Sequence, residues 1–531
     1  MRKKTLCTLC PEHASGAGVC PPCPLAEFNL VASDDRPPSP PSTFQRRRAR
    51  DIKRADDEVT RHLCCAAQAD FVFAQRLFDH IIRQPQRGIA TSPGVDIPAV
   101  LRHACAGRRR RALRDCALAA ISLSGLFTAL GTIAVAIHTL SLAPLHLLPW
   151  TLGTMLLGTT LVKFAYRLTK NRAITVSLSP SHFSLEQAPN PVKPLLRRRI
   201  TQIEELTRGN LSIYRKFEPF TGYGQVIGGW SFAIDVTKPR YEGAATKPFE
   251  VHDIRRHVAA QVQALNWKGL EVTDRIFVSG RDVWKDDGYV DDTGCPLPAV
   301  EGTKIDELLA ERDGRARPYT VIRLIGWDGE LALTIFLRFA FVQQNLFIEA
   351  SHSVLTPLQG RFHKYDKVRP ITSAWSLAWL AVRSIGLFGG VMNVFGHLSE
   401  FLQDRRALAE PAAAPQDRSF NHGASYCVRE ETSDSRYQRY FQKLDSEMYT
   451  KVVEQRVFDA MVEFLDEHNV HTGELIERQT TILNNGVLVT GGSSISGSSV
   501  AAGNNAQATT HLSAPSDNKS KKDKQGKQKE T

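Results

Sequence analysis

Four cysteines near the start of the chain have the spacing of a metal site. They form two C-x2-C pairs separated by nine residues: Cys7, Cys10, Cys20 and Cys23. Four thiolates in two such knuckles can hold zinc tetrahedrally, although few apolar residues surround these pairs. A start codon assigned too far upstream would also leave such a leader. Zinc at these cysteines is the one cofactor that the sequence predicts, and a stray leader is the alternative.

A glycine-rich stretch, FTGYGQVIGGW, is the second feature with the composition of a binding loop. It holds Gly222, Gly224, Gly228 and Gly229. A phosphate-binding loop of the dinucleotide type needs a strand before it and a helix after it. Because a strand is predicted directly after this stretch, a long hairpin loop is the favoured interpretation.

Three further groups of polar residues have side chains that could bind a metal or take part in catalysis. KDDGYVDDTG does not match an EF-hand and predicts a solvated acidic loop; its carboxylates are Asp286, Asp287, Asp291 and Asp292. The SGRD stretch covers Ser279–Asp282. His352, Ser353 and His363 cannot be assembled into a triad from sequence alone, and no GxSxG elbow occurs. No catalytic residue is assigned, and the sequence favours a binding protein over an enzyme.

A long uncharged run predicts that the protein lies in a membrane. From Ala117 to Val162 the chain has no Asp, Glu, Lys or Arg. As one helix the run would be about 69 Å long, more than twice a hydrocarbon core of about 30 Å, so it must fold back. The prolines of Ser141–Pro149 supply the reversal. The sequence predicts a transmembrane helical hairpin over 116–166, because helices buried in a soluble core normally keep one charged face.

The charges that flank the run predict its orientation. Arg108–Arg111 and Arg114 precede it, and Lys163, Arg167 and Lys170 follow it, whereas the turn is uncharged. The positive-inside rule then gives a multi-pass protein of the inner (plasma) membrane with its N-terminus and main domain in the cytoplasm. Only one of the ten cysteines lies in the central region, which is typical of reduced thiols.

The chain of 531 residues carries a net charge of +12, and its basic clusters suggest what it touches. They lie beside the apolar spans, where they attract anionic lipid head groups of the bilayer. Aromatic residues do not interleave with them as stacking platforms would require, so no nucleic-acid partner is expected.

The remaining chain is predicted to divide into segments of distinct composition. The central part, 171–370, reads as a cytosolic α+β domain with the order β-β-α-β-α-β-β-β and a mostly antiparallel sheet. Within it, helices are expected over Asp253–Leu265 and Thr303–Gly314, capped by Asp253 and Thr303. The other segments are a disordered leader with the cysteine pairs (1–55), a helical N-terminal region (56–115), an interfacial or third transmembrane helix (371–402), a linker (403–432), an amphipathic helical region (433–479), a Gly/Ser/Asn-rich β segment (480–508) and a disordered basic tail (509–531).

The C-terminal region is where self-association is expected. The long helix predicted over Ser435–His468 has an apolar stripe that needs a partner, either this protein's own domain or another copy. Its residues are Phe441, Leu444, Met448, Val452, Val457, Met461 and Phe464. The glycine-spaced segment after it suits short stacked strands, with a flexible tail as the alternative.

Several stretches together resemble a family of uncharacterised membrane proteins from actinomycete bacteria. They include GNLSIYRKFEPFTGYGQVIGGWSFAID, LALTIFLRFAFVQQNLFIEAS, YFQKLDSEMYTKVVEQRVFDAMVEFLDEHN and ERQTTILNNGVLVTGGS. The resemblance covers about 56–508 and leaves the cysteine pairs outside. It implies the membrane architecture and no assigned activity.

Three functions remain open at this point. The favoured one is a membrane-anchored binding, signalling or scaffold protein of unknown ligand that self-associates through its C-terminal region. The second is a membrane-anchored enzyme whose site combines the glycine loop, SGRD and the acidic loop. The third is a stress or conflict-system effector that assembles through its C-terminal tail.

Overall fold

The computed structural model describes residues 57–243, 245–285, 288–311, 314–386, 391–409 and 420–484. The predictions for the cysteine pairs of the leader, for Asp286 and Asp287, and for 485–531 lie outside the described residues. They stay predictions.

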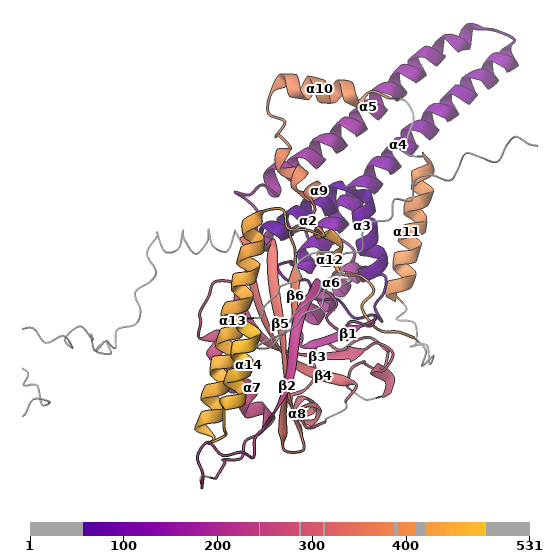
Figure 1. Ribbon diagram of the computed structural model, residues 1–531. Helices are drawn as coiled ribbons and strands as arrows, with labels where there is room; N and C mark the ends of the chain where they lie inside the picture. Colours follow the sequence, from indigo (N-terminus) through magenta and orange to yellow (C-terminus); the bar gives the residue numbers. More distant parts are fainter. Residues whose placement is uncertain are drawn as a thin grey trace, which may run out of the picture. The chain divides into compact units, whose positions relative to one another are not determined.

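The centre of the protein is a six-stranded mixed sheet with the strand order β1-β3-β4-β5-β6-β2 (Figure 1). β1 and β3 are parallel, and every other neighbouring pair is antiparallel. The predicted α+β class is confirmed, and so is the predicted order from β1 to β6, although an unpredicted helix, α6 (Pro194–Arg208), precedes β1. The strands are β1 (Leu211–Tyr214), β2 (Gln225–Asp235), β3 (Leu270–Ser279), β4 (Ala316–Gly326), β5 (Leu331–Val342) and β6 (Asn345–Leu355).

The sequence of β5 explains its place inside the sheet. LALTIFLRFAFV is buried on both faces over its first ten residues, as expected for a strand whose apolar run does not alternate. The turn before it, η6 (Trp327–Gly329), has left-handed backbone at Trp327 and Asp328, and the turn after it has Gln343 in that conformation. Both predicted hairpin turns, WDGE and QQN, therefore exist.

Three helices pack on one face of the sheet and complete its main core. They are α7 (Val251–Gln263), α13 (Tyr440–Glu467) and α14 (Gly473–Asn484). Phe458 and Met461 of α13 are fully buried in the same cluster as Leu337 and Ile348 of the sheet. The core of the domain therefore extends well beyond the expected boundary at residue 370, and 480–484 is helical rather than strand.

Two helix starts differ from the prediction by small shifts of the cap. The N-cap of α7 is Glu250, and Asp253 is the third helical residue, whose carboxylate closes a capping box onto the Glu250 N–H. α8 (Gly302–Ala310) begins after Glu301, so Thr303 lies inside its first turn. A carboxylate near a helix N-terminus offsets the helix dipole in either place, which is why residue type alone does not fix the boundary.

A second core is built mainly from helices that precede the sheet along the chain, together with one short helix that follows it. Its elements are α2 (Glu58–Ala69), α3 (Phe71–Leu77), η1 (Phe78–Ile82), α6 (Pro194–Arg208), α9 (Gly360–His363) and the first turns of α4 (Ile97–Thr139). Almost all of α2 is buried. This helical layer carries the two long apolar helices, so it lies between them and the sheet domain (Figure 1).

The two long helices are α4 (Ile97–Thr139) and α5 (Leu148–Arg172), joined by η2 (Ala143–Leu147), with η3 (Ala173–Ser177) after α5. They pack side by side as a hairpin (Figure 1). Both are long and apolar enough to cross a membrane, and only 11% of the residues in each apolar window are buried. Length and composition alone are weak evidence of membrane association, but the exposure of these windows is unlike that of a soluble core helix.

The third apolar stretch forms two helices rather than one. α10 (Ala374–Ser384) ends where Ile385 becomes extended, and α11 (Val391–Ala409) follows. An 11-residue helix is about 16 Å long, about half of a hydrocarbon core. α11 is tied to the start of α4 by ion pairs: Arg108 contacts Glu400 at 3.0 Å and Asp404 at 2.9 Å. These pairs set α11 beside the charged part of α4, before its uncharged run begins.

The apolar stripe predicted for the long helix is buried on this protein's own domain only in its second half, and its first half is exposed. Phe441 and Met448 are 66% and 45% exposed, and Leu444 and Val452 are also exposed, whereas Val457, Met461 and Phe464 are buried. Over 440–454 the buried residues are polar except for Val453: they are Gln442, Ser446, Thr450 and Glu454. They repeat every fourth position. Glu454 accepts from the indole N–H of Trp230 in β2 (2.9 Å), whereas Ser446 accepts from the Tyr437 hydroxyl and Gln442 from the N–H groups of Gln438 and Arg439, just before the helix.

The predicted linker is folded over its second part. Ala424 N donates to Ile213 O at 2.9 Å and so covers the outer edge of β1, and α12 (Val428–Thr432) follows. Arg429 of α12 is fully buried and donates to three backbone carbonyls, those of Gly329, Glu330 and Thr356. One side chain thereby fastens the β4–β5 turn to the end of β6.

Candidate functional site

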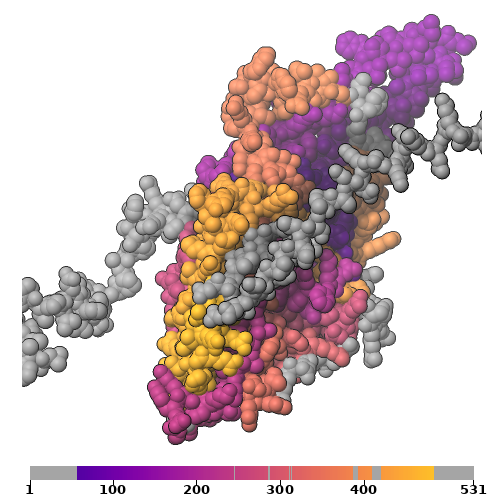
Figure 2. All heavy atoms as spheres, viewed as in Figure 1, coloured from indigo at the N-terminus to yellow at the C-terminus, as the bar shows by residue number. Residues whose placement is uncertain are grey.

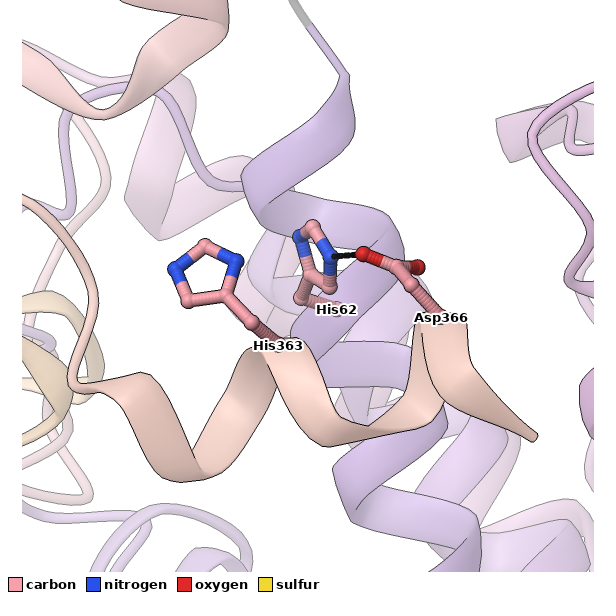
Figure 3. A group of neighbouring side chains, drawn as sticks. All are labelled: His62, His363 and Asp366. Atoms are coloured by element: carbon pink, nitrogen blue, oxygen red, sulfur yellow. Dashed lines mark hydrogen bonds and ion pairs between the residues drawn. The ribbon is translucent and has the colours of Figure 1, made fainter.

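Two histidines and an aspartate from distant parts of the chain meet beside α2. His62 lies on the second turn of α2, His363 ends α9, and Asp366 lies in η7 (Lys364–Lys367) (Figure 3). One potential ligand atom of each lies within 4.8 Å of the others. Phe362 and Tyr365 are buried in the helical core and anchor the short helix. The i, i+3 spacing of His363 and Asp366 then presents both on one face, toward α2.

Direct contacts hold Asp366 against α2. His62 Nε2 lies 2.7 Å from one carboxylate oxygen of Asp366, and Arg61 Nη2 donates to the other at 2.6 Å. Burial disfavours the charge, but the hydrogen bonds of His62 and Arg61 outweigh it and lower the pKa of the Asp366 carboxyl. The aspartate is therefore ionised at neutral pH.

Carboxylates also stand behind both imidazoles. Glu58 Oε2 accepts from Arg61 Nε at 2.7 Å and lies 3.9 Å from His62 Nδ1. Glu330, just after the β4–β5 turn, lies 3.2 Å from His363 Nε2. The side chain of His62 is 7% exposed, while those of His363 and Asp366 are 30% and 41% exposed. The cluster is thus closed on the α2 side and open to solvent on the other.

His363 was considered for a catalytic triad, whereas His62 and Asp366 were not predicted as site residues. His62 is far from the HKYD stretch along the chain, so no local spacing connects them. The His-x-x-Asp pair within HKYD was the only local signal, because on a helix it places an imidazole and a carboxylate on one face. The partner on α2 follows only from the packing of the two cores.

The structure separates His352 from Ser353. Successive side chains of a strand point to opposite faces. His352 lies on the α13 side, 3.1 Å from Glu454, whereas Ser353 pairs across the sheet with Thr334 on the other face. His363 lies on α9 beyond the strand. These three residues therefore form no triad.

The glycine loop is filled by a side chain of this protein. Gly222 and Gly224 have φ values of +104° and +92°, and both N–H groups donate to Glu430 Oε1, at 2.6 and 3.1 Å. Burial raises the pKa of Glu430, and these two bonds oppose the rise. Gly228 and Gly229 lie in β2 at a register shift. The anion-binding geometry exists, as its composition suggested, but an internal carboxylate occupies it.

SGRD and the described part of the acidic loop have structural roles. Gly280 N donates to Tyr214 O at 2.8 Å, and Gly280 O accepts from His422 N at 2.9 Å, so SGRD joins β1 to the 421–424 segment. Asp291 accepts from the backbone of Thr293 and Cys295, which closes a local turn. In each of the three parts of the predicted enzyme site, the described residues make hydrogen bonds with backbone or side-chain groups of the protein itself.

A cleft of about 530 Å³ lies between 91–98, the end of α6 and the edge of β3 and β4. Its charged side chains pair with basic residues around it: Asp274 with Arg255 at 3.1 Å and Glu204 with Arg102 at 3.2 Å. Paired surface charges are ordinary at such an edge. The cleft therefore adds no assigned chemistry.

A second hollow lies where α10 meets α5, at the base of the apolar hairpin. Its volume is about 610 Å³, and its lining includes Arg167, Trp375, Trp379 and Arg383. The Arg383 guanidinium lies 4.7 Å from the Trp379 ring centroid. Gly386 O accepts from Lys163 Nζ at 2.8 Å, which fixes the end of α10 against α5. Exposed tryptophans beside arginines are the composition of a membrane-interface surface.

These features define an α+β protein that carries two helices long and apolar enough to cross a membrane. The sequence model of the AbeC-like domain matches residues 229–496, and the chain belongs to this family. No curated protein and no solved structure matches the chain.

The match is narrower than the expected resemblance over 56–508. It runs from the middle of β2 past the end of α14 and includes α9 and α13. It leaves out both long apolar helices and α2, so His363 and Asp366 belong to the family domain and His62 does not. The actinomycete origin stays a prediction.

Proposed function

We propose that this protein is a membrane-anchored binding or signalling module in which the α4–α5 hairpin holds the AbeC-like domain at the cytoplasmic face of the plasma membrane. The observation that carries the proposal is the exposure of the hairpin. Leu126, Phe127 and Leu130 are 54%, 80% and 57% exposed, inside a run without charge. Such a surface is unfavourable in water and favourable among acyl chains.

The charges at the base of the hairpin support the cytoplasmic orientation. Arg108 and Arg114 of α4 and Lys163 and Arg167 of α5 lie at the end from which the helical layer and the sheet follow. The positive-inside rule puts this end in the cytoplasm. α10 then lies in the inner leaflet, where Arg167 and Arg383 contact phosphates of anionic head groups and the two tryptophans sit at the interface.

Cell fractionation of the full-length chain tests the anchor. We expect the protein in the membrane pellet, resistant to high salt and alkaline carbonate and released by detergent. A variant without 117–165 is expected in the supernatant. Arg114 lies 4.5 Å from the Tyr166 ring, so a short Gly/Ser link can join the two ends without disturbing the helical layer.

Reporter tags after residues 100, 143, 300 and 470 test the orientation. Only the tag after 143 is expected outside the cytoplasm. A well-folded, monomeric full-length chain that stays in the supernatant without detergent would refute the anchor. A cytoplasmic tag after 143 would refute the hairpin topology alone.

We also propose that the module self-associates through its C-terminal region. The support is the exposed apolar stripe at the start of α13, formed by Phe441, Leu444, Met448 and Val452. Replacing Phe441 and Met448 together by glutamine is expected to shift the detergent-solubilised protein from oligomer to single chain, measured by light scattering. The control is the same pair of changes at Tyr241 and Val342, which are also exposed. A wild-type mass of one chain contradicts self-association.

The enzyme alternative has less support, because the described residues of its three parts make structural contacts within the protein. The effector alternative rests on the tail after residue 484, outside the described residues. Deleting 485–531 would abolish assembly if the tail drives it and would leave the α13-mediated mass unchanged otherwise.

A further inference from the structure

We propose that His62, His363 and Asp366 form a binding site for a divalent transition metal, with zinc as the ion best suited to it. The inference concerns a different part of the molecule from the anchor and does not depend on it. Two imidazoles and one carboxylate are the protein ligands of many zinc centres in which a further position remains open. Asp366 and His363 are partly exposed, which provides a route for the ion.

The ligand atoms follow from the contacts around each residue. His62 Nε2 faces Asp366, and His363 Nε2 lies 3.2 Å from Glu330 without a hydrogen bond to it, so His363 Nδ1 is the nitrogen that serves as the metal donor. Figure 3 shows a ring nitrogen of His363 turned toward His62. A metal between His62 Nε2, His363 Nδ1 and the near oxygen of Asp366 needs only small side-chain movements, because these groups already lie within 4.8 Å.

Charged groups also stand behind each proposed ligand, where metal sites place their outer partners, although only Asp366 is hydrogen-bonded to its own. Metal-bound histidines usually donate their second N–H to a carboxylate, and metal-bound carboxylates are themselves hydrogen-bonded. Glu330 stands behind His363 at 3.2 Å and Glu58 behind His62 at 3.9 Å. Arg61 holds the far oxygen of Asp366 at 2.6 Å. His62 Nδ1 is buried without a hydrogen bond among the described residues, so the histidine is directed by packing rather than by a close partner.

The fixed charge of Arg61 is the main argument against a cation here. Its Nη2 lies 3.1 Å from His62 Nε2. However, two carboxylates, Glu58 and Asp366, contact this one guanidinium, and Glu330 adds a third negative charge beside His363. The pocket therefore keeps an excess of negative charge when both imidazoles are neutral, and a divalent ion reduces it.

A metal at this position would join two parts of the protein. His62 comes from the helical layer that carries the apolar hairpin, and His363 with Asp366 comes from the AbeC-like domain. The site would thus fasten the anchor to the domain through one ion.

Metal binding is tested on full-length, detergent-solubilised protein in which Cys7, Cys10, Cys20 and Cys23 are all replaced by serine. This background removes the four cysteines of the leader that are predicted to bind zinc and keeps the other six. After chelator treatment, zinc is titrated against a chromophoric competitor, and we expect about one ion per chain. Cobalt in its place is expected to give visible d–d bands without thiolate charge transfer.

Substitutions then assign the ligands. His363→Ala and Asp366→Asn are expected to weaken zinc binding at least about a hundredfold, and Glu330→Gln, which removes only an outer partner, about tenfold. His252→Ala is the control, because His252 also contacts two carboxylates, Glu250 and Asp253, at about 3 Å, and should leave binding unchanged.

Several results would overturn the proposal. They are zinc binding well below one ion per chain, unchanged affinity in both His363→Ala and Asp366→Asn, or a thiolate charge-transfer band with cobalt. The cobalt spectrum and Glu330→Gln decide the question if a ligand variant does not fold. Failure here leaves the fractionation result untouched, and the reverse also holds.

Discussion

Replacing Arg429 by leucine is expected to lower the free energy of unfolding by at least about 3 kcal/mol. Arg429 is fully buried, and its Nη2 donates to the carbonyls of Glu330 at 2.6 Å and Thr356 at 3.0 Å, with Gly329 at 3.4 Å. Burial lowers the pKa of Arg429 to about 10, which leaves it charged at neutral pH. Each buried acceptor left without a donor costs about 1–3 kcal/mol.

Thermal or denaturant unfolding of the full-length protein in detergent measures this effect. Arg429→Lys is expected to lose less than the leucine variant but still a measurable part, because one ammonium cannot reach all the carbonyls that the planar guanidinium spans. Arg76→Leu is the surface control. Arg76 of α3 pairs at 2.8 Å with Glu431, which lies on α12 like Arg429, but both side chains are nearly half exposed. A change in the free energy of unfolding within about 1 kcal/mol is therefore expected. Equal losses for the two leucine variants would refute the role given to Arg429.

The sheet was predictable because its signals are local. LEVTDRIFVS was expected over Leu270–Ser279, and β3 has these bounds. The strands β4, β5 and β6 are separated by short turns in which Asp328 and Gln343 adopt left-handed backbone, a conformation that polar residues in short loops tolerate. The start of the first long helix near Ile97 was predictable for the same reason, since Asp96 caps it and Pro98 follows.

The long helix shows where a local pattern misleads. Apolar residues recur at helical spacing along the whole of α13, but only the second half buries them. In the first half the domain offers polar partners, such as His352 and Trp230 for Glu454. A buried polar residue is stable only with its partner in place, and that partner lies in another strand, so periodicity could not reveal which face is inside.

The candidate site depends on the same kind of long-range information. Glu430 fills the glycine loop from a segment expected to be a linker, and His62 meets HKYD across two cores. Neither contact could be predicted from the residues that neighbour it in the sequence. What the sequence did supply was chemical type: glycines that can bind an anion, and a histidine and aspartate one helical turn apart.

A single arginine in the hairpin is expected to separate a membrane environment from water. Leu130→Arg lies within the uncharged run, where insertion scales assign about 2.5–3.5 kcal/mol to arginine at a bilayer centre. That corresponds to a reduction on the order of a hundredfold in an insertion equilibrium. The fraction of protein that resists alkaline carbonate extraction is expected to fall strongly.

Leu113→Arg is the matched control on the same helix. Leu113 and Leu130 are 60% and 57% exposed, so in water the two substitutions would have equal and small effects. Leu113 lies among Arg108–Arg111 and Arg114, on the proposed cytoplasmic side, where one more arginine reinforces the orientation. Only a change of solvent between these two turns of α4 makes the variants differ. If both stay membrane-bound to the same extent, Leu130 does not contact lipid, and the exposed hairpin must be covered by protein.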